Sequence, residues 1–313
     1  VGRGTSPERA HMSAVALSLV LASALIHAAW NALIKQARLH ARGPHTGPSR
    51  RSLVFVWLMV LFSIPWFAPV LAIQWPSLAV PPAGWLCLAG TALLHFLYYV
   101  LLALGYAAGE LSVVYPVARG VGPALVALGG ILALREPVSL PGLAGIAAII
   151  AGVVGLSHLS GRLAARRHAR DGRGLAYGMG IGLTVAGYSL VDKVGVGDVG
   201  VAPEVYMLLA HVGAGLVLTP VVLATCGADQ CRRAMRRSWA RPVLAGGLCV
   251  VGYLLVLHAF RMANASYVVP ARSCSILFAV LLGGRFLGER RVGGKLLAAC
   301  AIVGGIWLIA VRG

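Results

Sequence analysis

The sequence contains ten stretches of about 20 mainly apolar residues, the length that an α-helix needs to cross the hydrocarbon core of a bilayer. They are Met12–Lys35, Ser52–Ile73, Trp85–Ala107, Leu111–Leu134, Leu140–His158, Gly174–Val194, Pro203–Thr225, Pro242–Met262, Ser266–Leu287 and Lys295–Val311. Unpaired backbone groups in lipid cost several kcal/mol each, so these segments are expected to be helices. With 59% hydrophobic and 12% charged residues, the chain is predicted to be an all-α integral membrane protein of ten transmembrane helices.

The charged residues predict an orientation. Of the 27 lysines and arginines, 19 fall in the connections that follow the first, fifth, seventh and ninth spans, and six fall on the other side. The positive-inside rule then places those connections in the cytoplasm and both termini outside, in a multi-pass protein of a bacterial cytoplasmic membrane. The basic connections can also contact anionic lipid headgroups, at about 1 kcal/mol per residue. A net charge of +18 divided among short loops does not indicate a nucleic-acid surface.

An internal repeat divides the chain. Tyrosine, serine, proline, arginine and glutamate recur in the same order in both halves, as Tyr99, Ser112, Pro116, Arg119 and Glu136 and as Tyr253, Ser266, Pro270, Arg272 and Glu289. We assign residues 12–159 to the first repeat, 160–173 to a basic linker and 174–313 to the second repeat, and we set aside residues 1–11 as a tag-like or disordered extension. Because each repeat has five spans, the second enters the membrane from the opposite side, which predicts an inverted repeat of the kind found in transporters.

Arg119 and Arg272 are the charges that most need an explanation. Each lies about 6 to 8 residues inside its span, or about 9 to 12 Å deep at a rise of 1.5 Å per residue, which is close to the middle of the bilayer. A charge at that depth costs at least about 2.5 kcal/mol, so it is expected to face a cavity or a partner. Two interpretations stay open: the arginines bind an anionic substrate, or they snorkel to the interface or pair with helix carbonyls and with Glu110 or Glu136.

The repeats resemble a known family. SVVYPVARGVGPALVALGGILALRE, which starts at Ser112, and SYVVPARSCSILFAVLLGGRFLGER, which starts at Ser266, are similar to the two repeats of EamA-type permeases of the drug/metabolite transporter superfamily. HAAWNALIK, which starts at His27, is similar to a first-helix motif of some of these permeases. The resemblance covers the chain from Met12 onward and implies a bundle with a central cavity lined by helices 1, 3, 4, 6, 8 and 9. It also implies cytoplasmic termini, contrary to the charge count.

Other polar residues complete the predicted site. The substrate-binding candidates besides the arginines are Trp30, Asn31, Tyr99, Tyr115, Tyr188, Ser189 and Tyr253, although aromatic residues also pack between helices or anchor at the interface. The candidates for proton coupling are His27, His95, His211 and His258, since imidazole titrates near neutral pH. Pro116 and Pro270 are predicted to break their helices. Glu136 and Glu289 are expected to meet basic loop residues, and Asp192 need not pair with Lys193.

The sequence contains no motif for metal binding or for a dinucleotide cofactor in a suitable context. The six cysteines form no CxxC pair or Cys/His cluster, so we expect no metal, and GVGDVG follows a membrane helix rather than a strand, so we expect no dinucleotide cofactor. We therefore predict a secondary transporter, not an enzyme, that moves a small anionic or zwitterionic metabolite by alternating access, with export favoured by the resemblance and a proton or counter-substrate as the coupling partner. The alternative is a membrane enzyme acting on a lipid or polyprenyl phosphate; a channel fits the inverted repeat less well.

Overall fold

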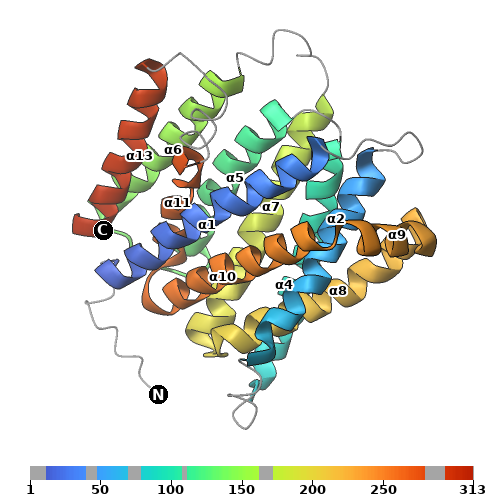
Figure 1. The fold of residues 1–313 in the computed structure, drawn as a ribbon. Helices are drawn as coiled ribbons and strands as arrows, with labels where there is room; N and C mark the ends of the chain where they lie inside the picture. Colours follow the sequence, from blue (N-terminus) through green and yellow to red (C-terminus); the bar gives the residue numbers. More distant parts are fainter. Residues whose placement is uncertain are drawn as a thin grey trace.

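The computed structural model describes residues 12–39, 48–69, 79–107, 111–161, 172–278 and 293–312, and these residues form helices without strands. The helices pack into one bundle (Figure 1). The set-aside residues 1–11 and most of the 160–173 linker lie outside the described part.

Helices make up the described part of each predicted span. In the first repeat they are α1 (Ala14–Leu39), α2 (Pro48–Ser63) with the 3₁₀ turn η2 (Ile64–Phe67), α4 (Pro82–Ala107), α5 (Leu111–Leu132) and α6 (Leu140–Gly161). In the second they are α7 (Gly172–Lys193) with the π-helical turn η4 (Val194–Asp198), α8 (Pro203–Cys226), α9 (Ala228–Ser238), α10 (Ala240–Met262), α11 (Ala265–Arg272) and α13 (Gly293–Arg312). Among the described residues, five helices are long and apolar enough to cross a membrane, and four shorter apolar helices accompany them. The predicted all-α membrane fold is confirmed.

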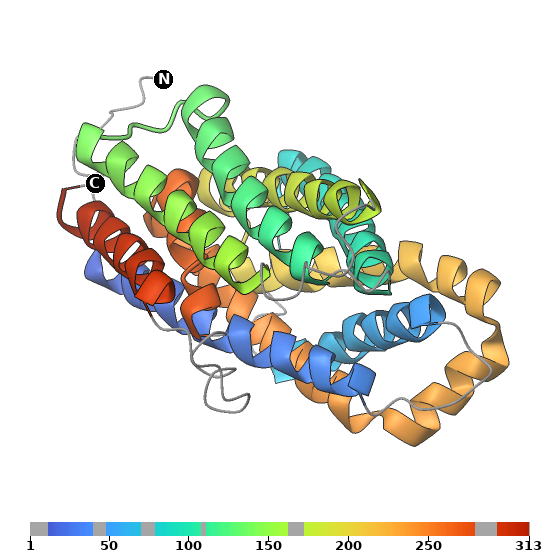
Figure 2. The same ribbon diagram turned by 90° about the horizontal axis from the view of Figure 1, so that it is seen from above.

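The two repeats pack against each other in matching pairs. Helix α1 packs on α10, and its counterpart α7 packs on α4; α2 packs on α10, and its counterpart α8 packs on α4. Three further contacts join a helix to its own counterpart: α2 with α8, α5 with α11, and α6 with α13. The last pair lies side by side at one end of the bundle (Figures 1 and 2). This pattern is what an inverted repeat with a two-fold axis in the membrane plane requires.

The contact between α6 and α13 brings backbone against backbone. A Cβ atom on Gly145 would lie 2.7 Å from the carbonyl oxygen of Gly305, and one on Gly152 would lie 2.7 Å from the carbonyl oxygen of Ala298. The intramembrane arginines are 153 residues apart, and the same offset relates Gly145 to Ala298 and Gly152 to Gly305. The two contacts are therefore one contact repeated by the symmetry, made possible by small residues of the type that close membrane-helix packing uses.

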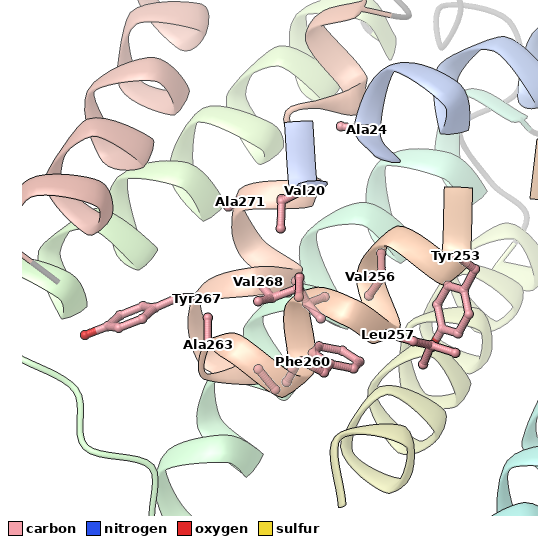
Figure 3. Close-up of a cluster of buried hydrophobic side chains, with 14 of the residues drawn as sticks. Val20, Ala24, Tyr253, Val256, Leu257, Phe260, Ala263, Tyr267, Val268 and Ala271 are labelled. Atoms are coloured by element: carbon pink, nitrogen blue, oxygen red, sulfur yellow. The ribbon is translucent and has the colours of Figure 1, made fainter. Parts of the chain in front are cut away.

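A corner between α10 and α11 forms much of the core. Figure 3 shows its buried side chains, among them Tyr253, Val256, Leu257, Phe260, Tyr267 and Val268, beside Val20 and Ala24 of α1. Tyr267 reaches from this corner toward α6. Its ring occupies the space beside Gly142, where a Cβ would lie 2.3 Å from the Tyr267 hydroxyl oxygen, and that oxygen accepts a hydrogen bond from the Ser139 amide at 3.1 Å.

The two prolines predicted to break their helices differ: Pro116 does not interrupt its helix, whereas a helix ends close to Pro270. Helix α5 continues through Pro116, because the proline ring withdraws a single amide from the helical ladder. Pro270 lies inside α11, which ends two residues later at Arg272. There the amides of Ser273 and Cys274 bond to the carbonyls of Pro270 and Ala271 at 2.9 and 3.1 Å, so the chain tightens into a turn. The ninth span is thus not the continuous helix that the hydropathy predicts.

Glu136 does not meet a basic loop residue in the described structure. Its carboxylate accepts hydrogen bonds from the amides of Ala265 and Ser266, at 2.7 and 2.9 Å, and from the Ser266 hydroxyl. These are the orphan donors at the start of α11, where the helix dipole favours a negative charge. The expectation of a basic partner is therefore wrong for Glu136, which joins the connection between α5 and α6 to the start of α11; Glu110 and Glu289 lie outside the described residues.

Candidate functional site

A cavity lies between the two repeats. Its lining comes from α1, α4, α5, α7 and α11, and comprises His27, Tyr98, Leu102, Val114, Ala118, Arg119, Pro123, Ile181, Val185, Tyr188, Val269, Arg272 and Ser273. Helix α10, expected from the resemblance to be among the lining helices, instead contributes Tyr253 behind Tyr188. The cavity leaves about 60 Å³ for the centres of water molecules, room for about four to six of them at roughly 10 to 15 Å³ each.

Both predicted arginines line this cavity and converge on one histidine. Arg119 from α5 donates to Nε2 of His27 on α1, and Arg272 from α11 approaches Nδ1 of the same ring at 3.1 Å. Arg272 also donates through Nε to the Ser23 hydroxyl at 3.0 Å, and that hydroxyl donates to the Gly252 carbonyl at 2.5 Å. The arginines are therefore oriented by named side chains and do not point toward the lipid.

Two positively charged guanidinium groups and an indole N–H converge on His27. A neutral imidazole has one donor nitrogen and one acceptor nitrogen, whereas the two nitrogens of His27 face guanidinium groups on either side. Nδ1 additionally lies 3.1 Å from the indole nitrogen of Trp30, a third donor. One neutral ring cannot satisfy these donors together. A carboxylate or phosphate between the arginines supplies two or more acceptor oxygens, and guanidinium groups bind such oxygens in bidentate pairs.

The lining residues Tyr98 and Tyr188 belong to a cluster of aromatic rings. Tyr188 stacks on His95 with ring centroids 4.3 Å apart and meets Tyr98 and Tyr253 edge-on at 5.7 and 5.8 Å. The guanidinium of Arg272 lies 5.5 Å from the centre of the Tyr253 ring. Such a cluster offers apolar faces to the body of a ligand whose charged end meets the arginines.

The remaining predicted residues lie in different places. Trp30 and Ser189 are buried, and Tyr99 pairs across helices with His211, at 3.4 Å from the hydroxyl oxygen to Nε2. His258, with a side chain 41% exposed, pairs with Glu204 at 2.9 Å and is not among the lining residues. The side chains of Asn31 and Tyr115 lie outside the described residues. The structure thus brings His27, Arg119, Tyr188 and Arg272 together at the cavity.

The sequence of both repeats matches the model of the EamA-like transporter family, over residues 14–158 and 172–311. The chain belongs to this family. A solved structure titled only "Crystal structure of protein" is similar to this chain, with a TM-score of 0.66 and 17% sequence identity. The match covers 95% of this chain and 96% of the other, which shows a shared fold. No curated protein sequence matches the chain.

Sequence reasoning missed three residues that this EamA-like protein places near the cavity. Ser23 lies one turn before His27 on α1, so the helical spacing of four residues was an available signal. Tyr98 is adjacent to the repeat-matched Tyr99, but its partner in the second half is a glycine, Gly252, so the repeat did not reveal it. Asp192 was considered only with regard to Lys193, and its fully buried position could not be read from the sequence.

Proposed function

We propose that this EamA-like protein is a secondary transporter that binds the carboxylate or phosphate of a small anionic or zwitterionic metabolite between Arg119 and Arg272. The observation that supports it best is the convergence of two guanidinium groups from opposite repeats on His27, in a cavity at the repeat interface. In inverted-repeat transporters this interface is where substrate binds.

The size of the cavity restricts the substrate class. Space for about four to six waters matches a compound of amino-acid or organic-acid size. A nucleotide sugar would need the helices to separate further. Export remains the direction favoured by the family resemblance, and a bacterial cytoplasmic membrane is the proposed location.

An enzyme acting on a lipid phosphate is the less favoured alternative. Such an enzyme must meet its headgroup at the membrane interface, whereas Arg119, within α5, and Arg272, at the end of α11, line a cavity between the two repeats. Counterflow separates the two functions, because a transporter exchanges labelled for unlabelled compound without forming a product.

The proposal is tested by ligand-induced thermal stabilisation of the purified protein against a panel of amino acids, organic acids, sugar phosphates and nucleotides. A compound that binds only the folded state, present at a concentration of 100 times its Kd, adds about 2.7 kcal/mol to the free energy of unfolding. Arg119→Lys and Arg272→Lys keep the charge but lose the bidentate fork, so each is expected to melt near the wild-type temperature and to lose most of the shift.

The matched control is Arg261→Lys, because Arg261 is exposed at the end of α10. It should retain the full shift with the same compound. If both cavity variants melt at a lower temperature and still show the full shift, the arginines serve to hold the helices together and the proposed binding site is wrong.

A further inference from the structure

One fully buried carboxylate lies behind the cavity. Asp192, near the end of α7 and one turn beyond Tyr188, is 0% exposed. Its Oδ2 accepts a hydrogen bond from the Tyr253 hydroxyl of α10, and its Oδ1 has no hydrogen-bond partner among the described residues. An acceptor oxygen that is buried without a donor is costly in an ionised carboxylate.

Two nearby hydroxyl groups also interact with the carboxylate, and each of them has a second partner. The Thr91 hydroxyl and the Tyr206 hydroxyl face the carboxylate from α4 and α8. Thr91 lies 3.0 Å from Nδ1 of His95, and Tyr206 donates to the Cys87 carbonyl at 3.3 Å. Lys193, the next residue, donates through Nζ to the carbonyls of Phe260 and Ala263 at 2.6 and 2.9 Å.

A proton is the species best suited to bind Oδ1 of Asp192. Protonation removes the buried charge, whereas a metal ion needs several ligands, and the described residues contain no group of three His, Cys, Asp or Glu that could hold one. The titratable groups around the carboxylate are Cys87 and His95 on α4, Tyr188 on α7, Tyr206 on α8 and Tyr253 on α10.

Tyr253 connects this carboxylate to the cavity. Its hydroxyl donates to Asp192, while the guanidinium of Arg272 lies 5.5 Å from the centre of its ring. A bound anion beside Arg272 would therefore be separated from Asp192 by this one side chain. Two negative charges so placed oppose each other, and neutralising one of them favours the other.

We propose that Asp192 is a proton-binding site linked to the anion site through Tyr253 and Arg272. A proton binds to Oδ1 and forms an O–H bond without breaking another bond. An anion in the cavity strengthens proton binding, and by reciprocity a proton on Asp192 strengthens anion binding. The linkage rests on the proposed transport function: the carrier moves a proton with its anion, and net flux follows their combined gradients. The proton site itself does not depend on transport.

The test is an infrared pH titration of the purified, substrate-free protein, which follows the absorption band of a protonated carboxyl group. We expect a band that titrates in the wild-type protein, is absent in Asp192→Asn, and is retained in the control Asp198→Asn, which removes an exposed acid six residues further on. If the band remains in Asp192→Asn, or if no buried carboxyl titrates, the proton site is refuted.

Two further variants keep Asp192 and test the linkage. Tyr253→Phe removes the donor to the ionised form, so the band should persist to higher pH. Arg272→Gln removes the positive charge and imitates its neutralisation by an anion, so proton affinity should rise about tenfold, within the usual range of linkage between sites. An unchanged titration in Arg272→Gln refutes the linkage while leaving the proton site intact. A titration that moves to lower pH as Na⁺ replaces choline shows that the site takes Na⁺ and overturns the assignment to a proton.

Discussion

Replacing Glu136 should weaken the joint between the first repeat and α11. Its carboxylate accepts from two backbone amides and one hydroxyl of α11, and it is 8% exposed. Glu136→Ala leaves both amides buried without an acceptor. At about 1 to 3 kcal/mol for each unsatisfied group, we expect a loss of about 3 kcal/mol in the free energy of unfolding. Glu136→Gln keeps one acceptor oxygen and should cost about half as much.

A substitution at Gly130 should disturb the same hydrogen bonds without changing Glu136 itself. A Cβ on Gly130 would lie 2.4 Å from Glu136 Oε2 and 2.3 Å from the Ser266 hydroxyl oxygen, so Gly130→Ala should displace the carboxylate and destabilise about as much as Glu136→Ala. The control is Gly304→Ala on α13, where no atom lies within 4 Å of the added Cβ. There the change should be neutral or stabilise by up to about 1 kcal/mol, because alanine favours a helix more than glycine does.

The measurement is reversible unfolding in detergent titrated with sodium dodecyl sulfate, followed by tryptophan fluorescence. The double variant Gly130→Ala with Glu136→Ala should be little worse than either single variant, since both remove the same hydrogen bonds. Additive losses would mean that the two residues act independently. A Glu136→Ala variant within about 0.5 kcal/mol of wild type, the range of ordinary surface substitutions, would refute the role of the carboxylate.

Three other outcomes are expected. Fusion of alkaline phosphatase to the C-terminus should give an active enzyme, and a fluorescent-protein fusion should stay dark, if the charge count outweighs the orientation implied by the family. Gly142→Ala should destabilise by about 1 to 3 kcal/mol in the same unfolding assay, because the Tyr267 ring fills the space of the added methyl group. Arg135→Gly should stabilise by about 1 kcal/mol, because Arg135 has a φ of 54°, in the left-handed region that glycine adopts without strain; Arg135→Ala, which keeps the strain, should not.

The sequence predicted the membrane helices well because the apolar length of a span and the repeat spacing are both written in the order of residues. It also identified Arg119 and Arg272 as intramembrane charges, since polar residues stand out in an apolar context. The connection after Thr225 was taken for a basic loop, but its residues form the amphipathic helix α9, with Cys231 buried and Arg232 and Arg233 exposed. Arginine-rich segments are helical only when a neighbouring surface covers their few apolar residues, which depends on tertiary packing.

The partners of the polar residues were harder to predict. Glu136 binds two residues of α11 that lie 129 and 130 positions further along the chain. Asp192 contacts Tyr253, which lies 61 positions further along. No local periodicity encodes such pairings. The shared dependence of both arginines on His27 likewise follows from the way three helices meet, and the sequence marked His27 only as a residue that titrates in a useful range.

The glycine contact between α6 and α13 bears on how such a chain can arise. Gly145 contacts Gly305, and Gly152 contacts Ala298 in the same way. The surface of α6 is therefore complementary to the equivalent surface of α13, its counterpart in the second repeat. An isologous surface of this kind lets a single five-helix unit pair with an identical copy inserted into the membrane the other way up. Duplication and fusion of such a unit would then need no new interface, and each half could afterwards acquire its own substitutions, as Tyr98 and Gly252 now differ.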